Sequence, residues 1–166
     1  MRVGVGGALA VALALLLACA CTDPVHSDRV DALGGELPGT HPGPDHRPGQ
    51  PCTYCHGGQG PAGPVFDLAG TVFLEPLGDA FGVEGAEVEL MDRTGKIVGA
   101  GTNRSGNFFF RDGELGLEFP LRTRIRYGGG DFIEMTTPIF RARSCGECHS
   151  GAGPDSVPRI FVQGTP

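Results

Sequence analysis

The sequence contains no tryptophan and only two tyrosines among its 166 residues, and charged residues make up only 19% of it. Thirteen Lys and Arg stand against nineteen Asp and Glu, which gives a formal net charge of −6. Nucleic acid binding needs a positive field and, for single strands, stacking aromatics, so this composition excludes a nucleic-acid partner. The main apolar run, residues 8–18, is too short for a membrane-spanning helix.

Two signatures of common enzyme folds are also missing. The stretch Gly57-Gly58-Gln59-Gly60 is not followed by the Gly-Lys-Ser/Thr of a phosphate-binding loop, and there is no Gly-x-Ser-x-Gly nucleophile elbow. The acidic residues Glu84, Glu87 and Glu89 fit a solvated strand face better than an acid–base pair. We therefore expect no enzymatic activity.

The N-terminus has the pattern of an export signal. Met1-Arg2 precedes the apolar run, which has the length of a secretory h-region. The run ends in Leu16-Leu17-Ala18-Cys19, which resembles the lipobox of bacterial lipoproteins and implies lipidation of Cys19. Cys21 is the weaker lipid site, and an ordinary cleaved signal peptide is the alternative. We predict a signal peptide over residues 1–18 and a lipid anchor on a periplasmic or cell-surface face of the bacterial envelope.

Glycine and proline are abundant, at 29 and 14 residues. Segment 38–45 reads Pro-Gly-Thr-His-Pro-Gly-Pro-Asp and cannot form a helix or a central strand, because proline lacks the backbone N–H. We therefore predict a flexible tether over residues 19–50. No helical period follows the signal peptide, so no further helix is expected.

Short apolar runs separated by turns begin after Val65 and predict an all-β fold. Over residues 121–127 apolar positions alternate with Arg122, Arg124 and Arg126, which predicts a half-buried strand with a cationic outer face. We expect an immunoglobulin- or transthyretin-like sandwich of seven strands. These strands are predicted at Phe66–Glu75, Ala86–Asp92, Lys96–Thr102, Asn107–Arg111, Phe119–Tyr127, Asp131–Arg143 and Arg159–Gln163.

Part of this region resembles the carboxypeptidase-regulatory-like sandwich. The resemblance rests on Gly82-Val83-Glu84-Gly85-Ala86-Glu87-Val88-Glu89-Leu90, on Thr94-Gly95-Lys96, and on Thr102-Asn103-Arg104-Ser105-Gly106-Asn107-Phe108. It covers residues 66–110 well and the later strands poorly. It implies a transthyretin-like fold that acts as a support or interaction module without catalysis of its own.

The six cysteines form three close pairs, at positions 19 and 21, 52 and 55, and 145 and 148. Disulfides that staple a small domain are usually spread more widely. Cys52-Thr53-Tyr54-Cys55-His56 and Cys145-Gly146-Glu147-Cys148-His149 are both Cys-x-x-Cys-His, the attachment motif of c-type haem. Two thiols three residues apart reach both vinyl groups of one porphyrin edge, and the next histidine faces the iron. We predict two covalent c-type haems, attached at Cys52, Cys55, Cys145 and Cys148, with His56 and His149 as proximal iron ligands.

Two other interpretations of the paired cysteines stay open. The four thiols could form one zinc site, although the separation of the pairs is longer than in zinc ribbons and both histidines would be left unexplained. Each pair could instead be a redox disulfide, although the βαβ context of thioredoxin-like proteins is absent.

A second resemblance joins the motifs to the sandwich. Phe66 and Ala69-Gly70-Thr71-Val72 follow the first motif, and Arg159-Ile160-Phe161-Val162 follows the second. This arrangement resembles small dihaem lipoproteins of environmental bacteria, in which a regulatory-like sandwich lies between two haem motifs. The likeness spans about residues 52–163. We predict a first haem-binding loop over residues 51–64 and a sandwich over residues 65–166 that carries the second motif in its last loop.

The sixth iron ligands are less well defined. His41 and His46 lie in the Pro/Gly-rich segment beside the first motif and are the candidate distal ligands. His26 is closer to the membrane tether and ranks after them. Met91 and Met135 are thioether alternatives, but both fall inside strand patterns and are expected in the core. The choice matters because axial ligands help to set the haem potential.

Together these features predict an exported, lipid-anchored dihaem c-type cytochrome that transfers electrons to redox proteins or other cytochromes, with self-assembly as a further option. If successive strands alternate in direction, both haems lie at one pole of the sandwich. The arginines of residues 122–126 either form a solvated face or meet haem propionates or an acidic partner. The rivals are a structural or adhesion lipoprotein with zinc or disulfide sites, and a haem enzyme with an open axial position.

Overall fold

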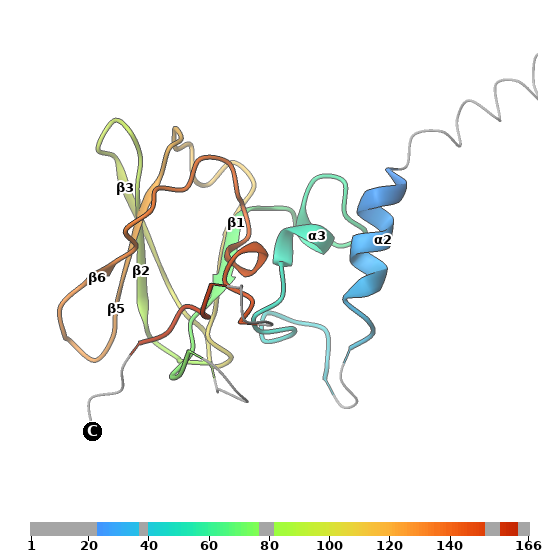
Figure 1. Cartoon of the computed structure of the whole chain (residues 1–166), viewed down its shortest axis with the longest axis horizontal. Coiled ribbons are helices and arrows are strands. Elements are labelled where there is room, and N and C mark those ends of the chain that lie inside the picture. Colours follow the sequence, from blue (N-terminus) through green and yellow to red (C-terminus); the bar gives the residue numbers. More distant parts are fainter. Residues whose placement is uncertain (1–22, 37–39, 77–81, 152–156, 163–166) are drawn as a thin grey trace, which may run out of the picture. The chain divides into compact units, whose positions relative to one another are not determined.

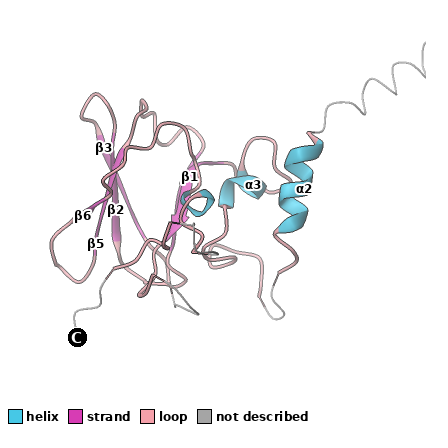
Figure 2. Cartoon of the chain, in the orientation of Figure 1, coloured by secondary structure: helices cyan, strands magenta, loops and turns pink. Residues whose placement is uncertain are grey.

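The computed structural model describes residues 23–36, 40–76, 82–151 and 157–162. The chain divides into two units, residues 1–34 and 35–166, which we describe separately. Loops and turns make up much of the second unit (Figure 2). The elements in chain order are α2 (Pro24–Ala32), α3 (Cys52–His56), β1 (Phe66–Thr71), β2 (Glu87–Met91), β3 (Ile97–Gly101), β4 (Asn107–Arg111), β5 (Arg122–Arg126), β6 (Ile133–Glu134) and the 3-10 helix η2 (Cys145–Glu147).

The first unit contains helix α2, which the sequence analysis did not predict. The carboxylate of Asp23 caps it by accepting from the backbone N–H groups of Val25 (3.0 Å) and His26 (3.3 Å), and Pro24 stands at its start. None of its residues is buried, so it has no apolar stripe that a helical period could reveal. The expectation of no helix beyond the signal peptide is therefore wrong for residues 24–32, and also for the one-turn helix α3 of the second unit.

The predicted signal peptide and the lipidation candidates Cys19 and Cys21 lie outside the described residues. Within the described part of the chain, no helix has the length and apolarity needed to cross a bilayer.

The second unit has an all-β body of two antiparallel sheets. The larger sheet has the strand order β3-β2-β5-β6 (Figure 1). Its register places Val88 opposite Ile125 and Leu90 opposite Thr123 on the inner face, which packs into the core. Because side chains alternate along a strand, the glutamates of β2 and the arginines of β5 share the outer face.

The smaller sheet consists of β1 and β4, and a later segment of the chain runs along the other edge of β1. Ser144 forms a parallel bridge with Ala69, and Phe161 forms one with Phe73. Backbone hydrogen bonds close these contacts, from Ala69 N to Arg143 O (3.0 Å) and from Val162 N to Phe73 O (2.9 Å). Strand β1 therefore has neighbours on both edges.

Apolar side chains from both sheets form one core. It includes Leu68 of β1, Val88 and Leu90 of β2, and Phe108 of β4, each at most 3% exposed. Burial of a side chain of this kind contributes about 1.5–3 kcal/mol to stability. Val162 joins the same cluster, so the last described segment belongs to the sandwich.

The first five predicted strands are found, four of them with shorter bounds and Asn107–Arg111 with the predicted bounds. Seven strands are not found, because the described residues contain six. The sixth, expected over Asp131–Arg143, is only the pair Ile133–Glu134. Beyond it the chain keeps isolated contacts with the β5 segment, at Met135 and Ile139, before it crosses to β1 at Ser144. The seventh, expected over Arg159–Gln163, is a single bridge at Phe161. A crossover of this kind depends on a long-range contact. It produces no alternation of apolar and polar residues from which it could be predicted.

Candidate functional site

The first Cys-x-x-Cys-His motif forms the one-turn helix α3, which follows Pro51. In this helix Cys52 and Cys55 stand three residues apart and therefore lie on the same side. The imidazole of His56 is buried and lies 4.5 Å from the ring of Phe66, between ring centroids. Strand β1, which begins at Phe66, thus positions the histidine of this motif.

The second motif forms the 3-10 helix η2 at the edge of β1. The backbone N–H groups of Cys148 (3.2 Å) and His149 (2.8 Å) both donate to Cys145 O, which closes the turn. The bridge between Ser144 and Ala69 fixes the start of this turn against the strand. The second motif is therefore held by a sheet edge, whereas the first precedes a strand.

Both motif histidines make the same hydrogen bond. The Nδ1 of His56 lies 2.8 Å from the carbonyl oxygen of Pro64, and the Nδ1 of His149 lies 2.7 Å from that of Pro158. Because a carbonyl only accepts, each Nδ1 is the protonated, donating nitrogen. The lone pair of each imidazole is then on Nε2, which is the tautomer that a metal-binding histidine needs.

The structure brings the two motifs side by side. A Cβ placed on Gly70 of β1 would lie 2.8 Å from Cys145 Sγ, and one on Gly146 would lie 2.8 Å from Gly49 O, just before the first motif. The thiols of Cys52 and Cys145 are near enough to interact electrostatically. The motifs meet alongside β1, where the chain returns from the larger sheet. The long strand expected over residues 131–143, which would have led to one pole of the sandwich, is reduced to two residues.

The electrostatics of the thiols bear on the redox interpretation. Burial raises the pKa of Cys52 to about 11. Burial and the neighbouring Cys52 raise the pKa of Cys145 to about 12. Thiol–disulfide oxidoreductases need a cysteine with a lowered pKa, since the thiolate is the nucleophile. The first cysteine of each motif has the opposite property.

The zinc interpretation requires four thiols in one cluster. In the part of the chain that the structure describes, no three His, Cys, Asp or Glu side chains are placed to hold a metal ion. A c-type haem makes a different demand, because the porphyrin supplies four ligands and the chain supplies only the axial ones.

An apolar pocket of about 270 Å³ adjoins the second motif. Cys145 and His149 line it together with residues of the larger sheet, including Arg124 and Glu134, with Phe108 of β4 and with residues 157–161. Its volume is near the lower end, about 300 Å³, of pockets that hold small molecules. The apolar members of its lining include Val88, Phe108, Ile125, Ile133, Val157 and Ile160.

The segment before the first motif is hydrogen-bonded to the sandwich. Asn107 Nδ2 donates to the carbonyl oxygens of Pro44 (3.1 Å) and His46 (2.9 Å), and the N–H of Gly49 donates to Thr71 Oγ1 (2.8 Å). These bonds place residues 44–50, the end of the predicted tether, against β1 and β4.

Of the predicted distal ligands, His46 lies closest to a motif histidine. Its ring stacks on that of His56 with centroids 5.6 Å apart and an interplanar angle of 26°. His46 therefore lies beside the histidine of the first motif, and its role as a distal ligand stays a prediction. His41 is exposed, and His26 belongs to α2 in the other unit.

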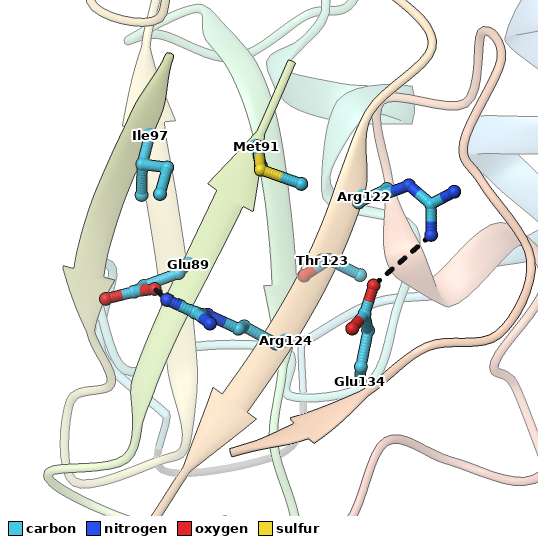
Figure 3. A pocket seen from close by; sticks show the side chains of 7 residues that line it. All are labelled: Glu89, Met91, Ile97, Arg122, Thr123, Arg124 and Glu134. Carbon is cyan, nitrogen blue, oxygen red and sulfur yellow. Dashed lines mark hydrogen bonds and ion pairs between the residues drawn. The ribbon is translucent and has the colours of Figure 1, made fainter. Parts of the chain in front are cut away.

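The two methionines lie in different environments. Met91 lines a small pocket on the outer face of the larger sheet, with Glu89 and Arg124 beside it (Figure 3). Met135 lines the apolar pocket that also contains Cys145 and His149. Both are partly exposed, so neither belongs to the buried core expected from the strand pattern.

The arginines of β5 are paired with glutamates on the same outer face. Arg122 pairs with Glu134 (3.4 Å) and Arg124 with Glu89 (2.6 Å), as Figure 3 shows, and Arg126 pairs with Glu87. Cross-strand pairing of opposite charges removes the free cationic face that the arginines alone suggested. Each of the three arginines is therefore balanced by a glutamate on the same face.

Sequence reasoning missed the two proline carbonyls that orient the motif histidines. A usable signal was present, because a proline follows each histidine at a similar distance, eight residues after His56 and nine after His149. It also missed Ser144, whose bridge to β1 brings the motifs together.

Comparison with known proteins gives no further identification. No protein-family model, curated protein or solved structure matches this chain.

Proposed function

We propose that this protein is an exported, lipid-anchored dihaem c-type cytochrome that transfers electrons and performs no catalysis of its own. Cys52 and Cys55 would attach one haem, and Cys145 and Cys148 the other. His56 and His149 would be the proximal ligands. The observation that carries the proposal is the Nδ1 hydrogen bond that each histidine makes to a proline carbonyl.

This hydrogen bond does two things that a proximal ligand requires. It fixes the tautomer, so that Nε2 is the basic nitrogen, and it fixes the rotation of the ring. The same arrangement occurs at two sites in one chain, each directly after a Cys-x-x-Cys pair, which is what two c-type haem sites require. A bond of this kind also raises the basicity of the ligand.

The surroundings of the second motif fit a porphyrin. The pocket beside Cys145 and His149 is lined mainly by apolar side chains. Two of these, Ile133 and Val157, are 55% and 47% exposed, and a flat apolar group in the pocket would cover them. When bound, haem supplies one-electron chemistry, and the protein contributes orientation, exclusion of water and the axial ligands.

The proximity of the motifs supports exchange between the two haems. Both motifs pack on β1, and Cys145 neighbours Cys52. Electrons entering at one site could therefore leave from the other to a redox protein, another cytochrome or a second copy of the chain. The envelope location and the lipid anchor at Cys19 belong to the same proposal and rest on the lipobox-like N-terminus.

The finer classification of the sandwich is also proposed. The turn glycines Gly95 and Gly106 have φ of +87° and +77°, a conformation that favours glycine. They occupy the turns quoted above for the carboxypeptidase-regulatory-like resemblance, which supports a transthyretin-like sandwich as the scaffold between the motifs.

The proposal is tested by expressing the chain with a c-type maturation system. We expect a covalent haem stain and a c-type spectrum. The paired substitution Cys52→Ala/Cys55→Ala should halve the haem content, and so should Cys145→Ala/Cys148→Ala. Replacing Cys21, which lies in neither motif, should leave the content unchanged. A colourless protein under these conditions would overturn the proposal.

A further inference from the structure

The larger sheet presents one thioether to the pocket of the second motif. The N–H of Met135 donates to Thr123 O (3.0 Å), which extends the pairing of β5 with β6 by one position. In that register Arg124 lies opposite Glu134 and Ile125 opposite Ile133. Met135 therefore stands opposite Thr123, on the same inner face as Ile125, and it lines the pocket with Cys145 and His149.

The other possible ligands are placed elsewhere. Met91 pairs with Arg122 and lies on the outer face, in the pocket of Figure 3. His46 stacks on the histidine of the first motif. Among the described His and Met side chains, His149 and Met135 are the two that line the apolar pocket.

The position of Met135 suits a ligand that must adjust to a bound group. Strand β6 is two residues long and forms the edge of the sheet, and the side chain of Met135 just after it is only partly buried. Methionine is unbranched and flexible, and its soft sulfur is a known axial ligand of haem iron. An apolar setting also suits a thioether better than a charged side chain.

We propose that Met135 would supply the sixth ligand of the second haem, with His149 as its other protein ligand. This inference rests on the proposed function. Methionine–histidine ligation raises the potential of a haem relative to bis-histidine ligation. If the first haem has a second nitrogen ligand, the two haems differ in potential, and the second is the better electron acceptor.

The test compares Met135→Leu with Met91→Leu in the haem-loaded protein. Leucine conserves volume and apolarity, so both variants should fold. We expect Met135→Leu to abolish the weak red absorption band of ferric methionine-ligated haem and to lower one of the two potentials. Met91→Leu should change neither. Two attached haems with an unaltered spectrum and unaltered potentials in Met135→Leu would overturn the assignment while leaving the proposed function intact.

A measurement without substitution at Met135 guards against a folding defect. In reduced Met91→Leu protein, labelled with 13C at the methionine methyl groups, an axial Met135 methyl is shifted far upfield by the porphyrin ring current. A methyl resonance at the ordinary position of a free methionine in a protein with two covalent haems would contradict the assignment. Absence of covalent haem from the wild-type chain would instead remove the proposed function itself.

Discussion

At the scale of single residues, the site depends on how the chain orients two imidazoles and buries two thiols. The proline carbonyls at positions 64 and 158 hold the Nδ1 atoms of His56 and His149. The first cysteine of each motif is partly buried, and this burial raises the pKa of its thiol. Orientation of a ligand and suppression of thiolate chemistry are both properties of an attachment site.

The pKa values of the thiols predict that the cysteines react at unequal rates in protein that is produced without haem. At pH 8 a thiol with a pKa of about 11 is roughly one part in 1,000 thiolate, and one with a pKa of about 12 roughly one part in 10,000. Cys52 and Cys145 should therefore react with iodoacetamide far more slowly than the exposed Cys148. Peptide mass spectrometry measures each site separately. Reaction of Cys52 as fast as Cys148 would contradict the assigned burial.

At the scale of elements, short turns and side-chain bonds hold the strands in register. The carboxylate of Asp92, between β2 and β3, accepts from Thr94 Oγ1 (2.6 Å) and from the N–H groups of Thr94 (2.8 Å), Lys96 (2.9 Å) and Glu118 (3.2 Å). The hydroxyl of Thr94 is the largest cause that lowers the pKa of Asp92 to about 2. This carboxylate stabilises the turn in its ionised form.

The Asp92 turn predicts a pH-dependent stability difference. A lowered pKa in the folded state means that the contribution is complete above the ordinary aspartate pKa near 3.8 and is lost as pH falls towards 2. Asp92→Asn should lower the melting temperature at pH 7, and the gap to wild type should narrow between pH 4 and pH 2. The exposed Asp131→Asn is the control. An Asp92→Asn melting curve identical to wild type at pH 7 would refute this role.

A second element-scale prediction concerns the loop that carries His46. Asn107 is buried and bonds to Pro44 O, His46 O and Thr71 Oγ1, so its removal leaves buried polar groups unpaired. Asn107→Ala should destabilise the protein by about 1–3 kcal/mol. Hydrogen exchange should also increase in residues 44–50. Ser105→Ala is the matched control in the neighbouring turn, since Ser105 is bonded there through its backbone N–H. Unchanged exchange in the loop would argue against this anchoring.

The elements also show what can be predicted from sequence. Strands β2, β3 and β5 could be predicted from alternating apolar positions and from the glycine-containing turns between runs. The Cys-x-x-Cys-His motifs could be predicted because they are local patterns. Helix α2 has no buried face and therefore no period to detect. The inward position of Met135 depends on the register of β6 with β5, and the meeting of the motifs depends on the bridge from Ser144 to Ala69. Both are long-range contacts, which local patterns do not contain.

At the scale of the whole molecule, the sandwich acts as a frame that joins the two Cys-x-x-Cys-His motifs, which are distant in sequence and are the proposed haem sites. Residues 52–56 precede β1, and residues 145–149 return to its edge, so one strand supports both. On the outer face of the larger sheet, three arginines pair with three glutamates, so these pairs carry no net charge. The described unit is thus arranged around the β1 edge, where electron exchange would take place.

The intact mass of the purified, denatured chain, after expression with c-type maturation, tests the central claim most directly. Covalent haem survives denaturation, so the mass should exceed that of the processed polypeptide by two haems. Each paired cysteine substitution should remove one of them. A mass equal to the polypeptide alone, with or without disulfides, would contradict the assignment as a dihaem cytochrome.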